Sequence, residues 1–275
     1  MTMFEATQDL ILPIIILMVS GAVAGVAAGM FGIGGGIILV AAITDVLMIM
    51  GTPPATAVKA AVGTSLATVI ITSLRSAQAH QKKGSFSKDA AIIWAPLIII
   101  GAVAGTALSS QGGRQLFQIL FLVIGPLLAY NMAFGRKDWS NVQIPAPKFL
   151  KPIIGSAVGF FSVMMGLGVG AMGVPAMTLF GLDLRRAIGT AAILGLCTSV
   201  PGALGFIITG YVDGVDIPGP SLGYFSLLAF VVIVPMTFLL APVGVWMNHK
   251  MPLDILRKAF AVLIIVNVLR VGLSI

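Results

Sequence analysis

Long apolar stretches separated by short polar loops follow one another along the whole chain of 275 residues. A helix that crosses the hydrocarbon core of a bilayer needs about 20 mostly apolar residues. Seven of the stretches have 19 or more residues, and three have 14 or fewer. The predicted segments are residues 10–31, 37–50, 57–76, 90–108 and 115–134 in the first half, and residues 152–165, 169–180, 187–209, 222–246 and 255–273 in the second. The pattern predicts an all-α integral membrane protein of about ten helical segments.

The three short segments flank two clusters of glycine. Twelve to fourteen helical residues rise only about 18–21 Å, whereas the hydrocarbon core is about 30 Å thick. The clusters are Gly32-Ile-Gly-Gly-Gly36 in the first half and Gly166-Leu-Gly-Val-Gly170 in the second. Irregular backbone persists at membrane depth only where protein or a polar cavity satisfies it. The clusters therefore predict broken or re-entrant helices.

The basic residues indicate how the segments are oriented, because Lys and Arg accumulate in cytoplasmic loops. With the N-terminus outside, 13 of the 16 Lys and Arg residues fall on the cytoplasmic side, in loops 75–88, 136–151, 183–186 and 249–258. The exceptions are Lys59, Arg114 and Arg270, and the acidic loop 210–221 falls outside. We therefore expect both termini on the extracytoplasmic side of the cell membrane. The expected organisation is a first repeat at 1–134 (with 1–9 as an extracytoplasmic tail), a cytoplasmic linker at 135–151 and a second repeat at 152–275.

Composition agrees with a membrane protein. Hydrophobic residues make up 58% of the chain and charged residues only 9%, against about 25% charged residues in a soluble domain. The net charge of +7 is spread over short loops and forms no nucleic-acid patch. A single cysteine, Cys197, allows neither an intramolecular disulfide nor a cysteine-rich metal site. The first residues carry Glu5 and Asp9 and no base, unlike the start of a cleavable signal peptide.

The two halves repeat one another. Gly21, Gly25, Gly32, Gly34 and Gly36 match Gly155, Gly159, Gly166, Gly168 and Gly170 at a constant offset of 134 residues. Lys59, Gly63 and Thr64 match Arg185, Gly189 and Thr190 at an offset of 126, and Pro96 and Gly105 match Pro235 and Gly244 at 139. The equivalent loops 75–88 and 210–221 carry opposite charge, so the halves are expected in opposite orientations. Inverted repeats of discontinuous helices are typical of secondary transporters with a site near the midplane.

Several motifs resemble the TauE/SafE sulfite exporter family over nearly the whole chain. In the first half these are Gly25-Val-Ala-Ala-Gly-Met-Phe-Gly-Ile-Gly-Gly-Gly36, Thr52-Pro-Pro and Ala60-Ala-Val-Gly-Thr-Ser-Leu66. Residues 159–175, followed by Ala187-Ile-Gly-Thr190, resemble the second repeat of that family. The resemblance implies transport, often outward, of sulfur-containing anions such as sulfite or sulfoacetate. Ala41 departs from the family, many members of which have proline there, and this weakens the assignment of a particular substrate.

The glycine clusters are the first candidates for an anion site, because a helix that begins after a glycine turn presents unpaired amides and a positive dipole end. The candidate glycines are Gly32, Gly34, Gly35, Gly36, Gly166, Gly168 and Gly170. Close helix packing explains glycines elsewhere, such as Gly101 and Gly105.

The charged candidates are Lys59, Arg185 and Asp45. Lys59 and Arg185 are equivalent in the repeat, and a cation near each glycine break would attract an anion. Arg185 also fits an ordinary cytoplasmic charge, whereas Lys59 departs from the positive-inside pattern. Asp45 is an intramembrane carboxylate, which suggests proton coupling, an ion pair with Lys59, or an interfacial position.

Thr64, Ser65 and Thr190 are hydroxyl candidates that either bind a sulfonate or bond to neighbouring helices. His80 and His249 lie in basic loops and are expected to be solvated, and Cys197 is expected to serve packing.

No nucleophile with a base, no carboxylate pair, no metal-ligand set and no ATP-binding motif stands out, so an enzyme and a cofactor are not expected. The sequence predicts a secondary transporter that carries a small anion by alternating access. The alternatives are an anion channel with the same glycine-lined pathway and a non-transporting scaffold. The expected partners are the anion and the lipid bilayer, and the sequence leaves open whether the chain forms a homo-oligomer.

Overall fold

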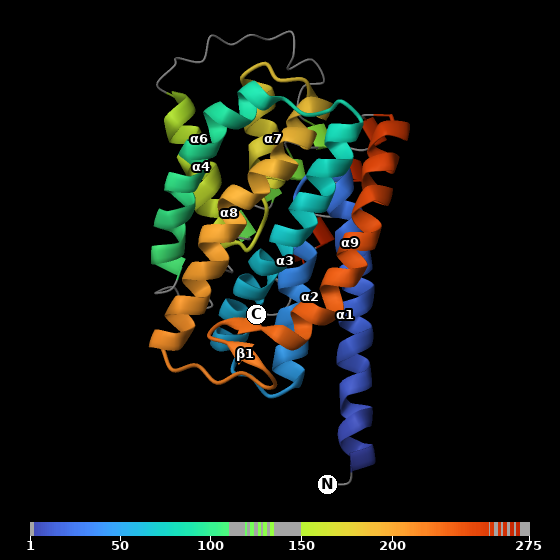
Figure 1. The fold of residues 1–275 in the computed structure, drawn as a ribbon, viewed down its shortest axis with the longest axis vertical. Coiled ribbons are helices and arrows are strands. Elements are labelled where there is room, and N and C mark those ends of the chain that lie inside the picture. The colour runs from blue at the N-terminus through green and yellow to red at the C-terminus, as the bar shows by residue number, and fades with distance from the viewer. Residues whose placement is uncertain are drawn as a thin grey trace.

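The computed structural model describes residues 3–109 and 150–252, with scattered residues from 119 to 134 and from 254 to 269. In this part the chain forms eight α-helices and one short antiparallel hairpin (Figure 1). The helices are α1 (Met3–Phe31), α2 (Gly36–Ile49), α3 (Pro54–Lys82), α4 (Lys88–Ser109), α6 (Leu150–Met164), α7 (Gly170–Leu179), α8 (Leu184–Val212) and α9 (Leu227–Lys250). The hairpin strands are β1 (Ser221–Leu222) and β2 (Phe225–Ser226). The all-helical class predicted from the sequence is confirmed.

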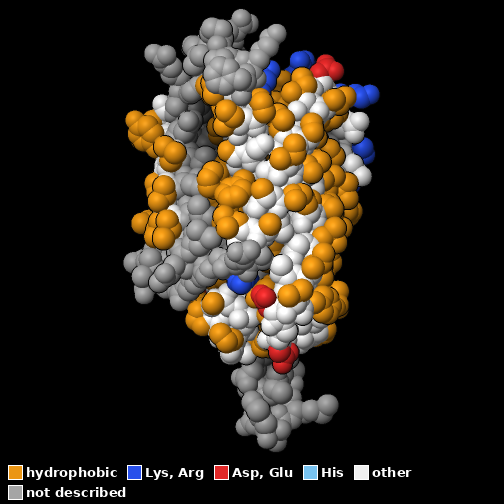
Figure 2. All heavy atoms as spheres, turned by 90° about the vertical axis from the view of Figure 1, so that its left-hand side faces the viewer, with side chains coloured by type: hydrophobic (Ala, Val, Ile, Leu, Met, Phe, Trp, Pro, Cys, Tyr) orange, Lys and Arg blue, Asp and Glu red, His pale blue; other side chains and the backbone are white. Residues whose placement is uncertain are grey.

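Five of the described helices are long and apolar enough to cross a membrane. They are α3, α4, α8, α9 and the part of α1 from Ile11 to Phe31. Hydrophobic side chains cover the flank seen in Figure 2, and most of the visible Lys and Arg side chains gather at its upper end. Such a surface fits a bilayer, because lipid-facing side chains need no charge.

The two breaks predicted at the glycine clusters are present. α1 ends at Phe31 and α2 begins at Gly36, while α6 ends at Met164 and α7 begins at Gly170. The predicted helices at 115–134 and 255–273 and the linker at 135–151 lie largely outside the described residues.

The last predicted long segment starts later than expected. The sequence placed its start at residue 222, but α9 begins at Leu227, after the hairpin. Gly223 has a φ of 57° between the two strands, and the Ser226 hydroxyl accepts a hydrogen bond from the Ala229 N–H at 3.4 Å. A glycine turn followed by a serine cap stops the helix from extending backward through the apolar residues before Leu227.

α3 and α8 form the centre of the bundle and pack against each other. In α3, 72% of the apolar window is buried, against 33–50% in the other four spanning candidates. α1 packs along α9 on one side and α4 along α6 on the other. The central helix α3 carries Lys59, Thr64 and Ser65, so these three candidates start from an enclosed position.

Candidate functional site

The first glycine cluster forms a tight left-handed turn between α1 and α2. Gly32, Gly34 and Gly35 have φ values of 67°, 70° and 77°. Residues with a β-carbon rarely adopt such angles, so glycine is required for the chain to reverse within so few residues. Gly35 is the N-cap of α2, and no side chain caps that helix.

The second cluster makes an equivalent turn with a different backbone. Gly166 has a φ of 67°, like Gly32. The N-cap of α7 is Val169, whose φ of −62° is right-handed, whereas Gly35 is left-handed. No side chain caps α7 either. The first amides of both helices therefore lack the side-chain partner that Asp183 supplies to α8.

The two turns touch at the buried centre of the molecule. The Gly168 N–H donates to the Ile33 carbonyl at 3.0 Å. A β-carbon at Gly36 would collide with the Gly166 carbonyl oxygen, and one at Gly170 would collide with Gly32. The structure thus brings together all seven predicted glycines, and the contact leaves no room for side chains between the turns.

Ser65 joins the two turns from α3. Its hydroxyl lies 3.0 Å from the Gly166 carbonyl oxygen and 3.5 Å from that of Gly36. A serine hydroxyl has one proton and donates to one acceptor at a time. In this conformation the Ser65 proton holds the turns together.

Thr64 and Thr190 each fasten a loop from the other half of the chain. The Thr64 hydroxyl oxygen accepts from the Ser226 N–H at 2.9 Å, and that of Thr190 accepts from the Ser87 N–H at 3.1 Å. Ser226 immediately precedes α9, and Ser87 immediately precedes α4. Both threonines are fully buried, so each satisfies a loop amide that water does not reach.

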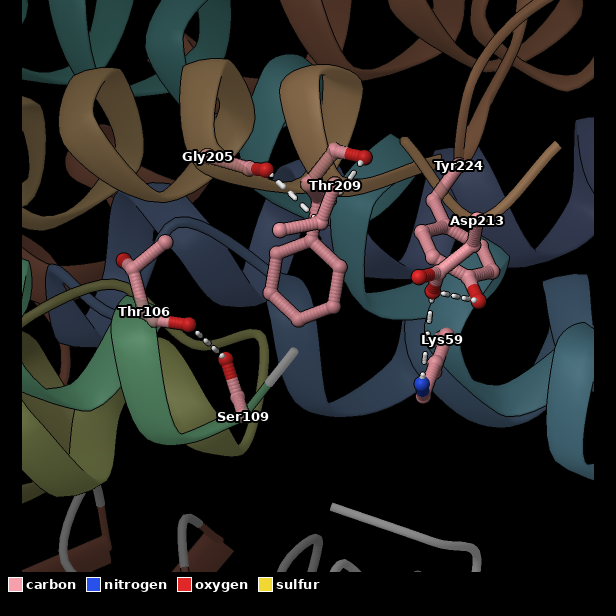
Figure 3. Close-up of polar contacts among 8 residues, drawn as sticks. Lys59, Thr106, Ser109, Gly205, Thr209, Asp213 and Tyr224 are labelled. Atoms are coloured by element: carbon pink, nitrogen blue, oxygen red, sulfur yellow. Dashed lines mark hydrogen bonds and ion pairs between the residues drawn. The ribbon is translucent and has the colours of Figure 1, made fainter. Parts of the chain in front are cut away.

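Lys59 belongs to a polar cluster where α3 begins, shown in Figure 3. Its Nζ lies 3.8 Å from Asp213 Oδ2 and 5.3 Å from the centre of the Tyr224 ring. The Tyr224 hydroxyl donates to Asp213 Oδ2 at 2.8 Å. Burial raises the pKa of Tyr224, and the hydrogen bond to Asp213 and the charge of that carboxylate raise it further. Lys59, at 16% side-chain exposure, is half enclosed by groups that hold its charge in place.

Arg185 lies where α8 begins, and α3 and α8 run in opposite directions (Figure 1). Its Nη2 donates to the Met251 carbonyl at 3.4 Å, and its buried Nε has no hydrogen-bond partner. Lys59 and Arg185 are therefore placed at opposite ends and are not brought together. Asp45 lies partly buried on α2.

The expectation that His80 is solvated was wrong. α3 continues to Lys82, six residues past the predicted end, so His80 lies inside the helix with 0% exposure. His249 is partly buried near the end of α9, with its Nε2 2.9 Å from Ser85 Oγ. Hydropathy treated the polar end of α3 as a loop because it does not register which face of a helix is covered.

Tyr224 and Asp213 were not recognised as partners of Lys59 in the sequence. Asp213 was seen only as an acidic loop residue, and no sequence signal connects it to a lysine so far away. Within the described ranges, no three His, Cys, Asp or Glu side chains converge as metal ligands would.

The helices, the apolar flank and the buried glycine turns define a multi-pass membrane protein, and comparisons with known sequences give its family. Residues 17–271 match the sequence model of the sulfite exporter TauE/SafE family, and the chain belongs to that family. A probable membrane transporter protein of Haemophilus influenzae is 32% identical over 255 residues, covering 92% of this chain and 96% of that protein. A probable membrane transporter protein of Methanocaldococcus jannaschii is 27% identical over 253 residues, covering 88% of each chain. No solved structure matches the chain. The protein is thus a membrane transporter.

Proposed function

We propose that this chain is a secondary transporter that moves a small sulfur-containing anion, sulfite or an organosulfonate such as sulfoacetate, out of the cell. The anion binds between the two glycine turns, and the two ends of the molecule open in alternation. Both termini lie on the extracytoplasmic side of the cell membrane. The observation that carries the proposal is the meeting of two helix N-termini, neither of them capped by a side chain, at the buried centre.

Anion binding follows from the electrostatics of those N-termini. Each helix N-terminus carries about half a positive charge and offers free amides. α2 begins at Gly36, which lies against Gly166, and α7 begins at Gly170, which lies against Gly32. Two such ends together offset about one negative charge without a cationic side chain. Binding requires the turns to separate, which releases the Ser65 hydroxyl and the Gly168 amide toward the anion.

The packing of the two halves supports an inverted repeat. Gly25 on α1 packs against Thr237 on α9, and Gly159 on α6 packs against Ile98 on α4. The sequence offsets of 134 and 139 residues convert the first contact into the second. The bond between Thr64 and Ser226 becomes the bond between Thr190 and Ser87 in the same way, with offsets of 126 and 139. Inverted repeats of this kind allow one end to open while the other stays closed.

Each end has its own fastening, which suits alternating access. The end with Lys59 is closed by the Thr64–Ser226 bond and by the contacts among Lys59, Asp213 and Tyr224. The opposite end is closed by the Thr190–Ser87 bond and by the contact of Ser85 with His249. A channel needs a continuous path, whereas here the two turns are in direct contact, which favours a carrier.

Flux measurements in proteoliposomes test the proposal with sulfite, sulfoacetate, taurine, thiosulfate and sulfate. We expect flux of sulfite or sulfoacetate that saturates with concentration and exceeds that of protein-free liposomes. Flux that does not saturate would indicate a channel. If none of the five solutes moves, the substrate class is wrong.

A further inference from the structure

His80 is a buried histidine whose protonation state is defined by its contacts. Its Nε2 lies 2.9 Å from the carbonyl oxygen of Gly29 on α1. A carbonyl oxygen only accepts hydrogen bonds, so Nε2 carries a proton. Nδ1 is then the basic nitrogen, and this buried atom has no hydrogen-bond partner. Buried polar atoms are nearly always paired, so an unpaired one calls for an explanation.

The groups around His80 disfavour a second proton in this conformation. The His249 ring on α9 lies 6.0 Å away, between ring centres. The charges of Arg185 on α8 and Lys83 in the following loop act on that second histidine, and Lys82 and Lys250 are exposed nearby in sequence. α1 contributes only a carbonyl, since residues 11–31 contain no titratable side chain. A protonated Nδ1 would therefore add a cation among cations and an N–H with no acceptor.

His80 is also close to the first glycine turn along two helices. Gly29, its hydrogen-bond partner, precedes Gly32 by three residues, which is about one helical turn. On α8, a β-carbon at Gly189 would lie 3.2 Å from the His80 β-carbon, and the carbonyl of the preceding Ile188 faces Gly32. A negative charge at the turn would therefore act on His80 through a short, largely dry distance.

The other half of the chain shows what this position needs for packing alone. An offset of 126 residues relates His80 to Phe206, as it relates Gly189 to Gly63. A β-carbon at Gly63 would lie 2.9 Å from the Phe206 β-carbon, which repeats the contact of Gly189 with His80. A ring that does not titrate fills the equivalent place, so packing does not account for a histidine here.

We propose that His80 is a proton-binding site linked to the anion site, so that the anion binds more tightly when His80 is protonated. The inference rests on the proposed function. An anion at the first glycine turn offsets the added charge, and opening of this end supplies water to Nδ1. Linkage is reciprocal: the proton raises the affinity for the anion by the same factor as the anion raises the affinity for the proton.

The first test compares anion affinity in proteoliposomes at about pH 5.5 and about pH 7.5, on either side of the usual titration range of histidine. Sulfate and thiosulfate are suitable probes because their charge does not change in this interval. We expect the wild-type affinity to be about tenfold higher at the lower pH. His80→Gln keeps a donor for the Gly29 carbonyl but does not titrate, and should abolish the pH dependence. The matched control His249→Gln should retain it.

A second readout does not depend on transport or on a variant that folds. The chain has only two histidines, so the ring signals of histidine-labelled protein in NMR spectra number two and are assigned with His249→Gln. At constant pH, adding sulfite, sulfoacetate or thiosulfate should convert the His80 ring from the neutral form with a proton on Nε2 to the doubly protonated form. An unchanged ring at saturating anion would overturn the proposal, as would wild-type pH dependence in His80→Gln. If wild-type protein transports none of the probes at either pH, the proposed function fails and this inference fails with it.

Discussion

The contact between the two glycine turns can be blocked by one methyl group on either side. Gly36 and Gly170 are the first residues of α2 and α7 and have no left-handed φ, so alanine fits the backbone at both positions. The methyl group of Gly36→Ala would meet the Gly166 carbonyl, and that of Gly170→Ala would meet Gly32. The substitutions therefore act by keeping the turns apart.

The size of the effect follows from two opposing contributions. Overpacking a tight contact costs about 1–3 kcal/mol, and this cost falls only on the conformation in which the turns touch. Alanine stabilises a helix by about 1 kcal/mol relative to glycine, and this gain applies to open and closed conformations alike. The closed conformation should lose about 5- to 150-fold in population. Since each cycle of a carrier passes through it, anion flux should fall by a similar factor.

The assay is sulfite flux in proteoliposomes, with thermal unfolding measured on the same preparations. Gly51→Ala is the matched control, because Gly51 follows α2 and a β-carbon there would meet nothing within 4 Å. Its φ of 92° makes alanine strained, by about 1–3 kcal/mol, so it tests for loss of stability without obstruction. We expect Gly51→Ala to transport and both turn variants to fail. Wild-type flux in Gly36→Ala and Gly170→Ala would show that the turns do not need to touch during transport.

Three further predictions follow from the ends of the molecule. Lys59→Gln should weaken anion affinity at least tenfold, or about 1.4 kcal/mol, and Lys59→Arg less so; unchanged affinity in a binding titration would leave Lys59 as an anchor for Asp213 alone. Thr64→Val removes the acceptor of the Ser226 N–H and should destabilise the protein by about 1–3 kcal/mol, which thermal unfolding would register; an unchanged unfolding temperature would show that the bond is dispensable. With Cys197 replaced, cysteines at Asp213 and at the exposed Lys83 should react with impermeant reagents from opposite faces of the membrane, and labelling from one face would contradict the inverted repeat.

The sequence predicted the positions of the broken helices well. The short segment expected at 37–50 is α2, Gly36–Ile49, and that expected at 169–180 is α7, Gly170–Leu179. Both boundaries follow from local chemistry, since the glycine clusters end one helix and the next apolar run starts another. The ends of the long helices were less predictable, because α3 continues through polar residues that tertiary packing buries.

The candidate site was predictable only as far as its glycines. Spacing along the chain identified both clusters, but it held no information that Gly36 would rest on Gly166 or that Ser65 would bridge the two turns. Those contacts are between residues about 100 or more positions apart, and they depend on how the halves dock. For the same reason the hydroxyls of Thr64 and Thr190 were considered as free ligands, whereas both accept loop amides in this conformation.

Distances across the two ends, measured on the same protein with and without anion, test the alternating-access account most directly. Spin labels can be placed at Ile49 and Val212 near one end and at Lys82 and Arg186 near the other, all exposed positions, after replacement of Cys197. Double electron–electron resonance in lipid nanodiscs would then give one distance for each end, before and after addition of sulfite or sulfoacetate. We predict that the anion shifts the two distances in opposite directions, so that one end opens as the other closes. Two distances that stay fixed, or that widen together, would contradict alternating access.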